Sequence, residues 1–246
     1  MNMFTPRALL RKTNEYLIPL AIIFSGLIVA GAIVFTNFSD SKQAAPLVDG
    51  GEIAAPIPSV SVNVKDVNIA GAPFIGDSDA PVTLVVWEDF QCPFCKQFEL
   101  KTLPLIVEKY VATGKVKIVF KDFAFLGPDS ETGALVSRAV WELYPHAYAL
   151  WRAAFYAAQD EEGGGFGDEA SVLALTKSIP GIDAANVAAL MTKKKAEYLK
   201  SINDDRDEGA LFGIQGTPGF VTGTQSLSGS LPYANFAQAL DAQLNK

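Results

Sequence analysis

The pattern of apolar and polar residues divides the chain into three parts. Leu17–Phe35 is an apolar run of nineteen residues, and no charged residue occurs between Tyr16 and Ser39. A helix of that length spans about 30 Å, which is the thickness of the hydrocarbon core of a bilayer. Residues 39–58 are small, polar and rich in proline and glycine, which predicts a flexible linker. Residues 59–246 carry the periodic patterns of a folded domain.

Apolar segments in the first half of this domain predict β-strands. Ser59–Val64 alternates apolar and polar residues and is expected to form a short edge strand. Val82–Trp87 and Val116–Phe120 are rich in β-branched residues, as is typical of buried central strands. The residues between them favour a helix that Pro104 kinks or divides. If that helix is a crossover, the two strands are parallel.

The second half of the domain is expected to be mainly helical. Glu131 to about Phe212 has a helical pattern, with breaks at Gly163–Gly165 and at Pro180-Gly181. A hairpin with strands at Phe220–Thr222 and near Ser226–Ser228 follows, and Pro232 opens a final helix. The order strand, helix, strand, helical insertion, hairpin and helix indicates an α/β fold.

The charges beside the apolar run predict its orientation. Three basic residues and one acidic residue lie in the first fifteen positions, whereas the following flank is nearly balanced. Positive flanks stay in the cytoplasm, so we expect residues 1–15 to be cytoplasmic and residues 16–38 to be a single-pass anchor in the cell membrane. The domain would then lie outside the cytoplasm. A cleaved signal peptide or a buried core helix are the alternative interpretations, although a signal peptide usually has a shorter apolar core.

Composition and charge narrow the functional classes. The chain has 246 residues and a formal net charge of −7, and this acidity argues against nucleic acid as a partner. It contains only two cysteines, Cys92 and Cys95. A secreted protein held together by disulfides would have more cysteines, spread along the chain. The two cysteines are therefore expected to serve chemistry.

Cys92 and Cys95 have the spacing of a redox pair. They follow a predicted strand and open a predicted helix, and the N-terminus of a helix stabilises a thiolate. We therefore predict Cys92 as the attacking nucleophile and Cys95, about one turn later and more buried, as the thiol that resolves the mixed disulfide. Pro93 and Phe94 lie between them and are expected to tune the reduction potential.

A zinc site and a structural disulfide are two other interpretations of the cysteine pair. Tetrahedral zinc needs four ligands, and beyond the two cysteines the chain offers only one histidine, His146, so no metal site is expected. A structural disulfide would close a very short loop and remove little entropy from the unfolded chain. No cofactor is expected other than the redox-active disulfide Cys92–Cys95 itself.

Two segments resemble motifs of the DsbA-like thiol–disulfide oxidoreductases. Thr83–Cys95 resembles their active-site segment, and Gly216–Val221 resembles their threonine–cis-proline loop. The resemblance extends from about Val64 to Leu244. It implies a thioredoxin-like fold over residues 59–246, with a central mixed sheet flanked by helices and a helical subdomain inserted at about residues 131–212.

The resemblance also implies roles for single residues. Thr217 and Pro218 would lie against the cysteine pair, joined by a cis peptide bond, and would bind the substrate. Asp89 occupies the acidic position three residues before the first cysteine, where it could orient water or take part in proton transfer. Alternatively, Asp89 or Glu88 is a surface carboxylate at the strand end. Phe94 replaces the histidine of the most oxidising relatives, and Gly219 replaces a larger residue, which would widen the substrate groove.

The predicted function is an extracytoplasmic dithiol oxidase that passes its disulfide to exported proteins with cysteine thiols. A quinone-linked membrane partner would reoxidise it. A disulfide isomerase or reductase with the same cysteines is the first alternative, and a tethered, non-catalytic module is the second. We expect a monomer, since exported isomerases often carry a dimerisation segment and the region before Val64 has the composition of a linker.

Overall fold

The structure, a computed structural model, describes residues 62–161 and 164–246. These residues belong to one compact unit of the chain, Pro58–Lys246. The cytoplasmic segment predicted at 1–15, the anchor at 16–38 and the linker at 39–58 lie outside the described residues. Within the part of the chain that the structure describes, no helix is both long and apolar enough to cross a bilayer.

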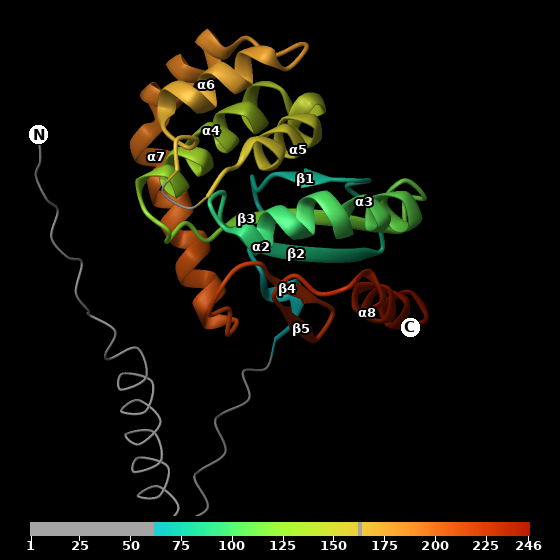
Figure 1. Cartoon of the computed structure of the whole chain (residues 1–246). Coiled ribbons are helices and arrows are strands. Elements are labelled where there is room, and N and C mark those ends of the chain that lie inside the picture. Colours follow the sequence, from blue (N-terminus) through green and yellow to red (C-terminus); the bar gives the residue numbers. More distant parts are fainter. Residues whose placement is uncertain (1–61, 162–163) are drawn as a thin grey trace, which may run out of the picture. The chain divides into compact units, whose positions relative to one another are not determined.

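A five-stranded mixed sheet lies at the centre of the domain (Figure 1). Its strands, in the spatial order β1-β3-β2-β4-β5, are β1 (Phe74–Ile75), β2 (Val82–Glu88), β3 (Val116–Asp122), β4 (Gly219–Thr222) and β5 (Gln225–Ser228). β2 and β3 are parallel, and the other neighbouring pairs are antiparallel. The sheet and its flanking helices confirm the predicted thioredoxin-like α/β fold.

The crossover between β2 and β3 is an irregular helix. Its segments are α2 (Pro93–Gln97), the π-helical η2 (Phe98–Thr102), α3 (Leu103–Ile106) and the π-helical η3 (Val107–Val111). Pro104 lies in the first turn of α3. Proline has no N–H to donate to the preceding turn, so the regular α-helical bonding is interrupted there. The prediction that Pro104 divides this helix is confirmed.

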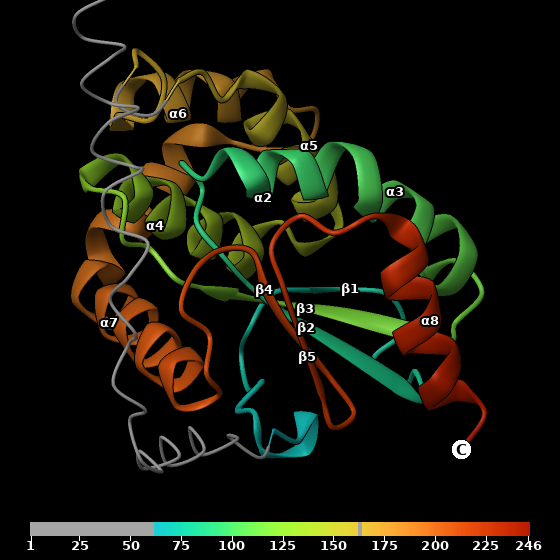
Figure 2. The same ribbon diagram turned by 60° about the horizontal axis from the view of Figure 1, so that its bottom comes forward.

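The insertion consists of helices that cluster on one side of the sheet in Figure 1, except that the last of them continues past the sheet, where its final turns pack against Trp87. They are α4 (Pro128–Leu143), the short 3-10 helix η4 (Pro145–Ala147), α5 (Tyr148–Ala158), α6 (Glu169–Ser178) and α7 (Ala184–Leu211). The insertion begins at Pro128, three residues before the predicted start, because Pro128 occupies the first turn, where proline is tolerated. Figure 2 shows the final helix, α8 (Tyr233–Leu244), beside α3.

The prediction of an edge strand at Ser59–Val64 is wrong for its described residues. Val64–Asp66 forms a 3-10 helix, η1, capped by the side chain of Asn63, whose Oδ1 accepts the N–H of Lys65 at 3.1 Å. Asn63 favours such a local bond over strand pairing. β1 is the edge strand instead, and it pairs with β3.

Two hydrophobic clusters cover the two faces of the sheet. Alternate residues of β2 point to opposite faces, so that Leu84 and Val86 belong to the larger cluster under α2–α5, whereas Val85 and Trp87 belong to the smaller one. Trp87 Nε1 donates to the backbone oxygen of Asp205 at 2.9 Å. Both faces of β2 are therefore buried, as the near-continuous apolar run predicted.

Asp205 of α7 ties the insertion to the end of β3. Its carboxylate lies 2.5 Å from Lys121 Nζ and 2.5 Å from Arg138 Nη2. Lys121 also pairs with Glu208, and Arg138 with Asp122. Lys121, Asp122 and Asp205 are buried and the other two members are partly buried, and the network joins β3, α4 and α7 by charge-assisted hydrogen bonds.

Asp205→Ala should destabilise the domain by about 3 kcal/mol. Lys121 and Arg138 would each lose one carboxylate in a buried place but keep another, which sets the loss at the lower end for buried ion pairs. Urea unfolding measures the change. Asp204→Ala is the matched control, because Asp204 forms an exposed pair with Lys200 and its loss should alter the midpoint little. Equal losses in the two variants would contradict the assignment of Asp205 as the linking residue.

Candidate active site

The two predicted motifs meet at one edge of the sheet. β2 ends at Glu88, and β4 begins at Gly219, which lies opposite Trp87 in the antiparallel register. The redox turn that follows β2 and the Thr217–Pro218 loop that precedes β4 therefore leave the sheet side by side. The Thr217–Pro218 peptide bond is cis, and Cys92 Sγ donates to the Thr217 backbone oxygen at 3.3 Å. The predicted position of this loop against the cysteine pair is confirmed.

Cys92 is the N-cap residue of α2. Pro93 occupies the first turn of the helix, and the Cys92 carbonyl accepts the N–H of Lys96 at 3.1 Å. Cys95 lies one turn further on and is buried. Both thiols are free, so the structure describes the reduced form. The placement matches the predicted strand, redox turn and helix.

The environment of Cys92 stabilises its thiolate. The pKa of Cys92 is lowered from 9.0 to about 6, and the largest cause is a hydrogen bond from the Cys95 side chain. Partial burial opposes this lowering of the pKa, whereas the side chain of Thr217 and the backbone N–H groups of Cys95 and Phe94 add to it. Donors at the start of a helix are the arrangement that favours a reactive thiolate.

Cys95 has the opposite environment. Burial raises the pKa of its thiol well above 9.0, and the neighbouring Cys92 and the carboxylate of Glu88 raise it further. Cys95 therefore stays protonated and donates to Cys92. This asymmetry favours the predicted roles, with Cys92 as nucleophile and Cys95 as resolving thiol.

Asp89 and Glu88 are not surface carboxylates, so that interpretation is wrong for both. Asp89 is fully buried, and its oxygens accept the backbone N–H groups of Gln91, Phe125 and Leu126 at 2.8, 2.9 and 3.1 Å. These bonds join the redox turn to the loop after β3. A part for Asp89 in proton transfer stays a prediction.

Glu88 belongs to a buried charge cluster that the sequence reasoning missed. Arg152 of α5 contacts both Glu88 oxygens and lies 2.6 Å from Glu99, and its guanidinium stacks over the ring of Phe120 at 3.6 Å. The cluster lies close enough to Cys95 for the Glu88 charge to raise the pKa of that thiol. The available signal was that Arg152 is the single charged residue of the apolar helix α5.

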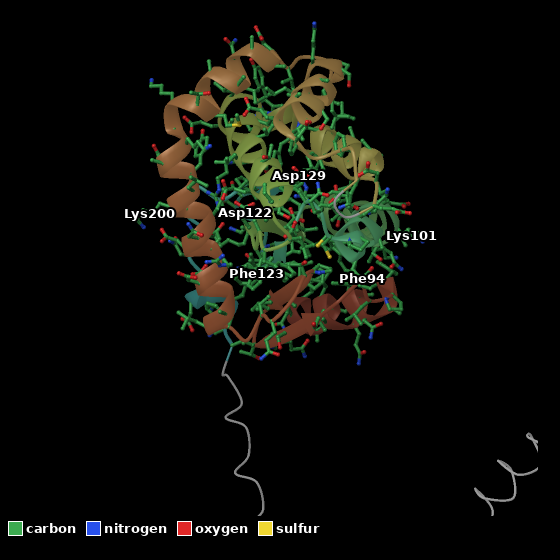
Figure 3. All side chains as sticks on the ribbon, turned by 60° about the vertical axis from the view of Figure 1, so that its left-hand side comes forward. Phe94, Lys101, Asp122, Phe123, Asp129 and Lys200 are labelled. Atoms are coloured by element: carbon green, nitrogen blue, oxygen red, sulfur yellow. The ribbon has the colours of Figure 1, made fainter. Side chains whose placement is uncertain are left out.

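The surface beside the cysteines is partly apolar. Phe94 lies between the two cysteines in the sequence and is 59% exposed, and its position is labelled in Figure 3. On the other side of the Thr217–Pro218 loop, a cavity of about 260 Å³ is bounded by Ile214, Gly216 and Gly219. A Cβ on Gly219 would lie 2.6 Å from Ile214 Cγ2, so this close packing requires glycine. A wider substrate groove at Gly219 stays a prediction.

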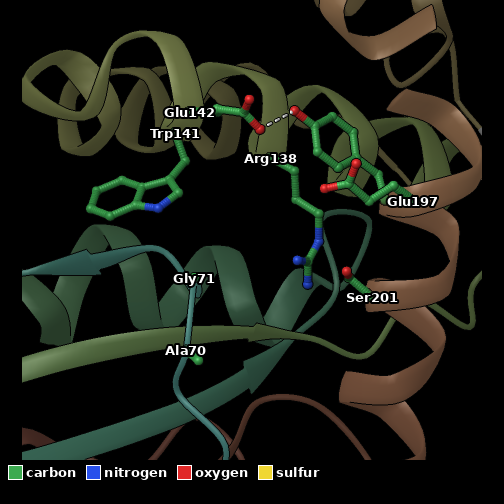
Figure 4. Close-up of a pocket in the computed structure, with 8 residues that line it drawn as sticks. Ala70, Gly71, Arg138, Trp141, Glu142, Glu197 and Ser201 are labelled. Carbon is green, nitrogen blue, oxygen red and sulfur yellow. Dashed lines mark hydrogen bonds between the residues drawn. The ribbon is translucent and has the colours of Figure 1, made fainter. Parts of the chain in front are cut away.

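A second cavity lies away from the predicted site residues. It has a volume of about 400 Å³ and lies between α4 and α7 (Figure 4). Arg138 and Glu142 line it from α4, and Tyr198, whose hydroxyl donates to Glu142 at 2.9 Å, lines it from α7. No predicted site residue borders it, so the redox site and this cavity are separate.

Comparisons with known proteins agree with the geometry. Residues 69–242 match the family model described as thioredoxin. The chain is 28% identical over 239 residues to the probable disulfide bond formation protein D of Bacillus anthracis, covering 96% of this chain and 100% of that protein. It is 25% identical over 177 residues to the disulfide bond formation protein D of Bacillus subtilis, covering 72% and 79%.

Solved structures show the same similarity. The oxidised form of BdbD from Bacillus subtilis superimposes with a TM-score of 0.69 at 25% identity, covering 76% of this chain and 99% of that one. The catalytic domain of ScsC from Proteus mirabilis gives a TM-score of 0.60 at 28% identity, with coverages of 73% and 92%. Both similarities take in the larger part of this chain.

Replacing Cys95 should separate the effect of its hydrogen bond from that of its bulk. In Cys95→Ala the donor is lost, so the pKa of Cys92 should rise from about 6 towards 9.0. Cys95→Ser keeps a hydroxyl donor and should hold the pKa lower than Cys95→Ala does. The rate of alkylation of Cys92 by iodoacetamide as a function of pH gives both values. Identical midpoints in the two variants would show that the hydrogen bond is not the main cause.

Proposed function

We propose that this chain, which belongs to the thioredoxin family and is a DsbA-like thiol–disulfide oxidoreductase, acts as a dithiol oxidase on exported proteins. The observation that supports oxidation of substrates, rather than their reduction, is the stabilised thiolate of Cys92, whose pKa is lowered to about 6. A protein that stabilises its reduced form gives up its disulfide readily, because reduction then releases free energy.

The tendency of the cysteine pair to oxidise its substrates depends on pH. A thiol whose pKa is depressed in the folded protein stabilises the reduced form fully above pH 9, its ordinary pKa, and loses that effect as the pH falls through about 6. At neutral pH most of Cys92 is thiolate, so part of the stabilisation is present. The oxidising tendency should therefore weaken in acid.

The exchange requires two steps. A substrate thiolate attacks Cys92 Sγ of the oxidised pair, forming a mixed disulfide and releasing Cys95 Sγ, which takes up a proton. A second substrate thiolate then attacks the substrate sulfur of the mixed disulfide, and Cys92 leaves as the thiolate that its surroundings stabilise. The substrate loses two electrons and two protons, and the cysteine pair gains the two electrons.

Thr217 and Pro218 are proposed to bind the substrate. Their loop presents the Thr217 backbone oxygen at Cys92 Sγ, and β4 continues from it. An extended peptide beside this loop would place its own cysteine at Cys92. The exposed ring of Phe94 would offer an apolar contact on the other side.

The cellular setting is part of the proposal. We infer that residues 16–38 form a single-pass membrane anchor and that the domain works as a monomer outside the cytoplasm. Two relatives are named as disulfide bond formation proteins, and this name supports exported proteins as substrates. The cycle needs an oxidant, for which a quinone-linked membrane protein is proposed. No cofactor beyond the cysteine pair takes part.

The redox equilibrium of the full chain in glutathione buffers tests the direction. We expect a potential nearer to the ~−120 mV of strong periplasmic oxidants than to the ~−270 mV of thioredoxin. Cys92→Ser is the control and should show no exchange. A value near that of thioredoxin would reject the oxidase in favour of a reductase or isomerase. Absence of exchange in the unmodified chain would favour the non-catalytic module.

Labelling of Cys92 in spheroplasts tests the compartment. After mild reduction, a membrane-impermeant maleimide should label the full chain without lysis. Cys92→Ser should lose most of the label, because Cys95 is less exposed than Cys92 and burial raises the pKa of its thiol. Labelling that appears only after lysis would place the domain in the cytoplasm and overturn this part of the proposal.

A further inference from the structure

The helical insertion contacts the backbone of the redox turn through two side chains: the hydroxyl of Tyr156 donates to the Asp89 backbone oxygen at 3.4 Å, and Gln159 reaches further along the turn, to Cys92. Gln159 follows α5 directly as its C-cap residue, and it is 3% exposed. Its Nε2 donates to the backbone oxygen of Phe90 at 2.7 Å and to that of Cys92 at 3.3 Å. In return, Lys96 of α2 donates to the backbone oxygen of Gln159. The insertion and the redox segment therefore each donate hydrogen bonds to the backbone of the other.

The side chain of Phe90 strengthens this link. Its ring packs against Trp151, Phe155 and Tyr156 of α5, with centroid distances of 5.7, 4.8 and 5.4 Å. Gly133 of α4 comes so close that an added Cβ would lie 2.6 Å from Phe90 Cβ. The residue two positions before Cys92 is thus enclosed by the insertion.

The two carbonyls that Gln159 binds determine where Cys92 Sγ lies. The Cys92 carbonyl also accepts the first backbone bond of α2, from Lys96. With this carbonyl fixed, the backbone N–H groups of Phe94 and Cys95 stay in the first turn of α2 beside Cys92, where they favour the thiolate. If the carbonyls of Phe90 and Cys92 lost their donor, the turn could rotate and these N–H groups would move away from the sulfur.

We propose that Gln159 is a positioning residue for thiol–disulfide exchange, through which the helical insertion holds the redox turn in the geometry that stabilises the Cys92 thiolate. The inference rests on the exchange activity of the cysteine pair and is independent of the direction of exchange. It assigns a function to the insertion. Gln159 acts through the backbone of the turn and does not touch the substrate.

A purely structural role predicts a different result. If Gln159 only satisfied two buried carbonyls, its loss would destabilise the oxidised and the reduced forms equally. If it positions Cys92, the reduced form loses more, because only that form carries the thiolate. The pKa of Cys92 and the redox equilibrium then shift, whereas general destabilisation moves neither.

The experiment uses Gln159→Met in the full chain, since methionine keeps the length of the side chain and removes the donor. Thiolate absorbance of the reduced minus the oxidised form, followed against pH, gives the pKa of Cys92. We expect the pKa of Cys92 to rise by about one unit, because the N–H groups of Phe94 and Cys95 would stabilise the thiolate less once the turn can rotate. At pH 7 the glutathione equilibrium should shift about fivefold towards the disulfide.

Gln97→Met is the matched control. Gln97 is the last residue of α2 and is exposed, so the same replacement on the redox helix should leave the pKa and the equilibrium unchanged. If Gln159→Met does not fold, Gln159→Asn keeps the amide on a shorter side chain and should shift both quantities in the same direction.

Urea unfolding of both redox forms completes the test. A greater loss of stability in the reduced form supports positioning. Equal losses, with the pKa of Cys92 and the glutathione equilibrium unchanged, would overturn the inference while leaving the proposed oxidase intact. A reductase-like potential in the unmodified chain would overturn the oxidase and leave this inference untouched.

Discussion

The pairing of β2 with β3 on one side and with β4 on the other is the constraint on which the site depends. β2 runs parallel to β3, so its C-terminal end lies where the crossover helix begins. β4 is antiparallel to β2 and therefore starts at that same end. Cys92 and Thr217 are 125 positions apart in the chain, yet this register places the sulfur of one at the carbonyl of the other. The chemistry at Cys92 follows from that meeting.

Local patterns predicted much of this arrangement. β2, β3 and β4 are apolar or β-branched runs between turn residues, and such runs identify strands without knowledge of their partners. The mainly polar β5 was predictable from the Gly223-Thr224 turn that precedes it. β1 was missed because two residues, Phe74 and Ile75, are too few to show any alternation. The segment before Val64 showed alternation but is capped locally by Asn63. Before Val64 the alternating pattern is too short to compete with the local hydrogen bond of the Asn63 side chain.

The parts of the site that sequence could not predict are long-range polar contacts. Arg152 reaches Glu88 across 64 positions, and Gln159 reaches the Phe90 carbonyl across 69. No spacing rule connects such residues, because their meeting depends on how α5 packs against the sheet. Only the presence of a charge within an apolar helix marked Arg152 as unusual. The cysteine pair and the Thr217–Pro218 loop were predictable since each carries its own short motif.

The close approach of Gly133 to Phe90 has a consequence for exchanging parts between relatives. The short segment that carries Cys92 and Cys95, here called the cassette, could be considered for transfer onto the scaffold of a relative. Here the cassette would bring Phe90 against whatever residue stands at position 133, and any side chain there would collide with the ring. A functional graft would therefore have to carry the facing segments of α4 and α5 along with the cysteines. The active-site turn and the insertion thus depend on each other's side chains, even though they are separate in the sequence.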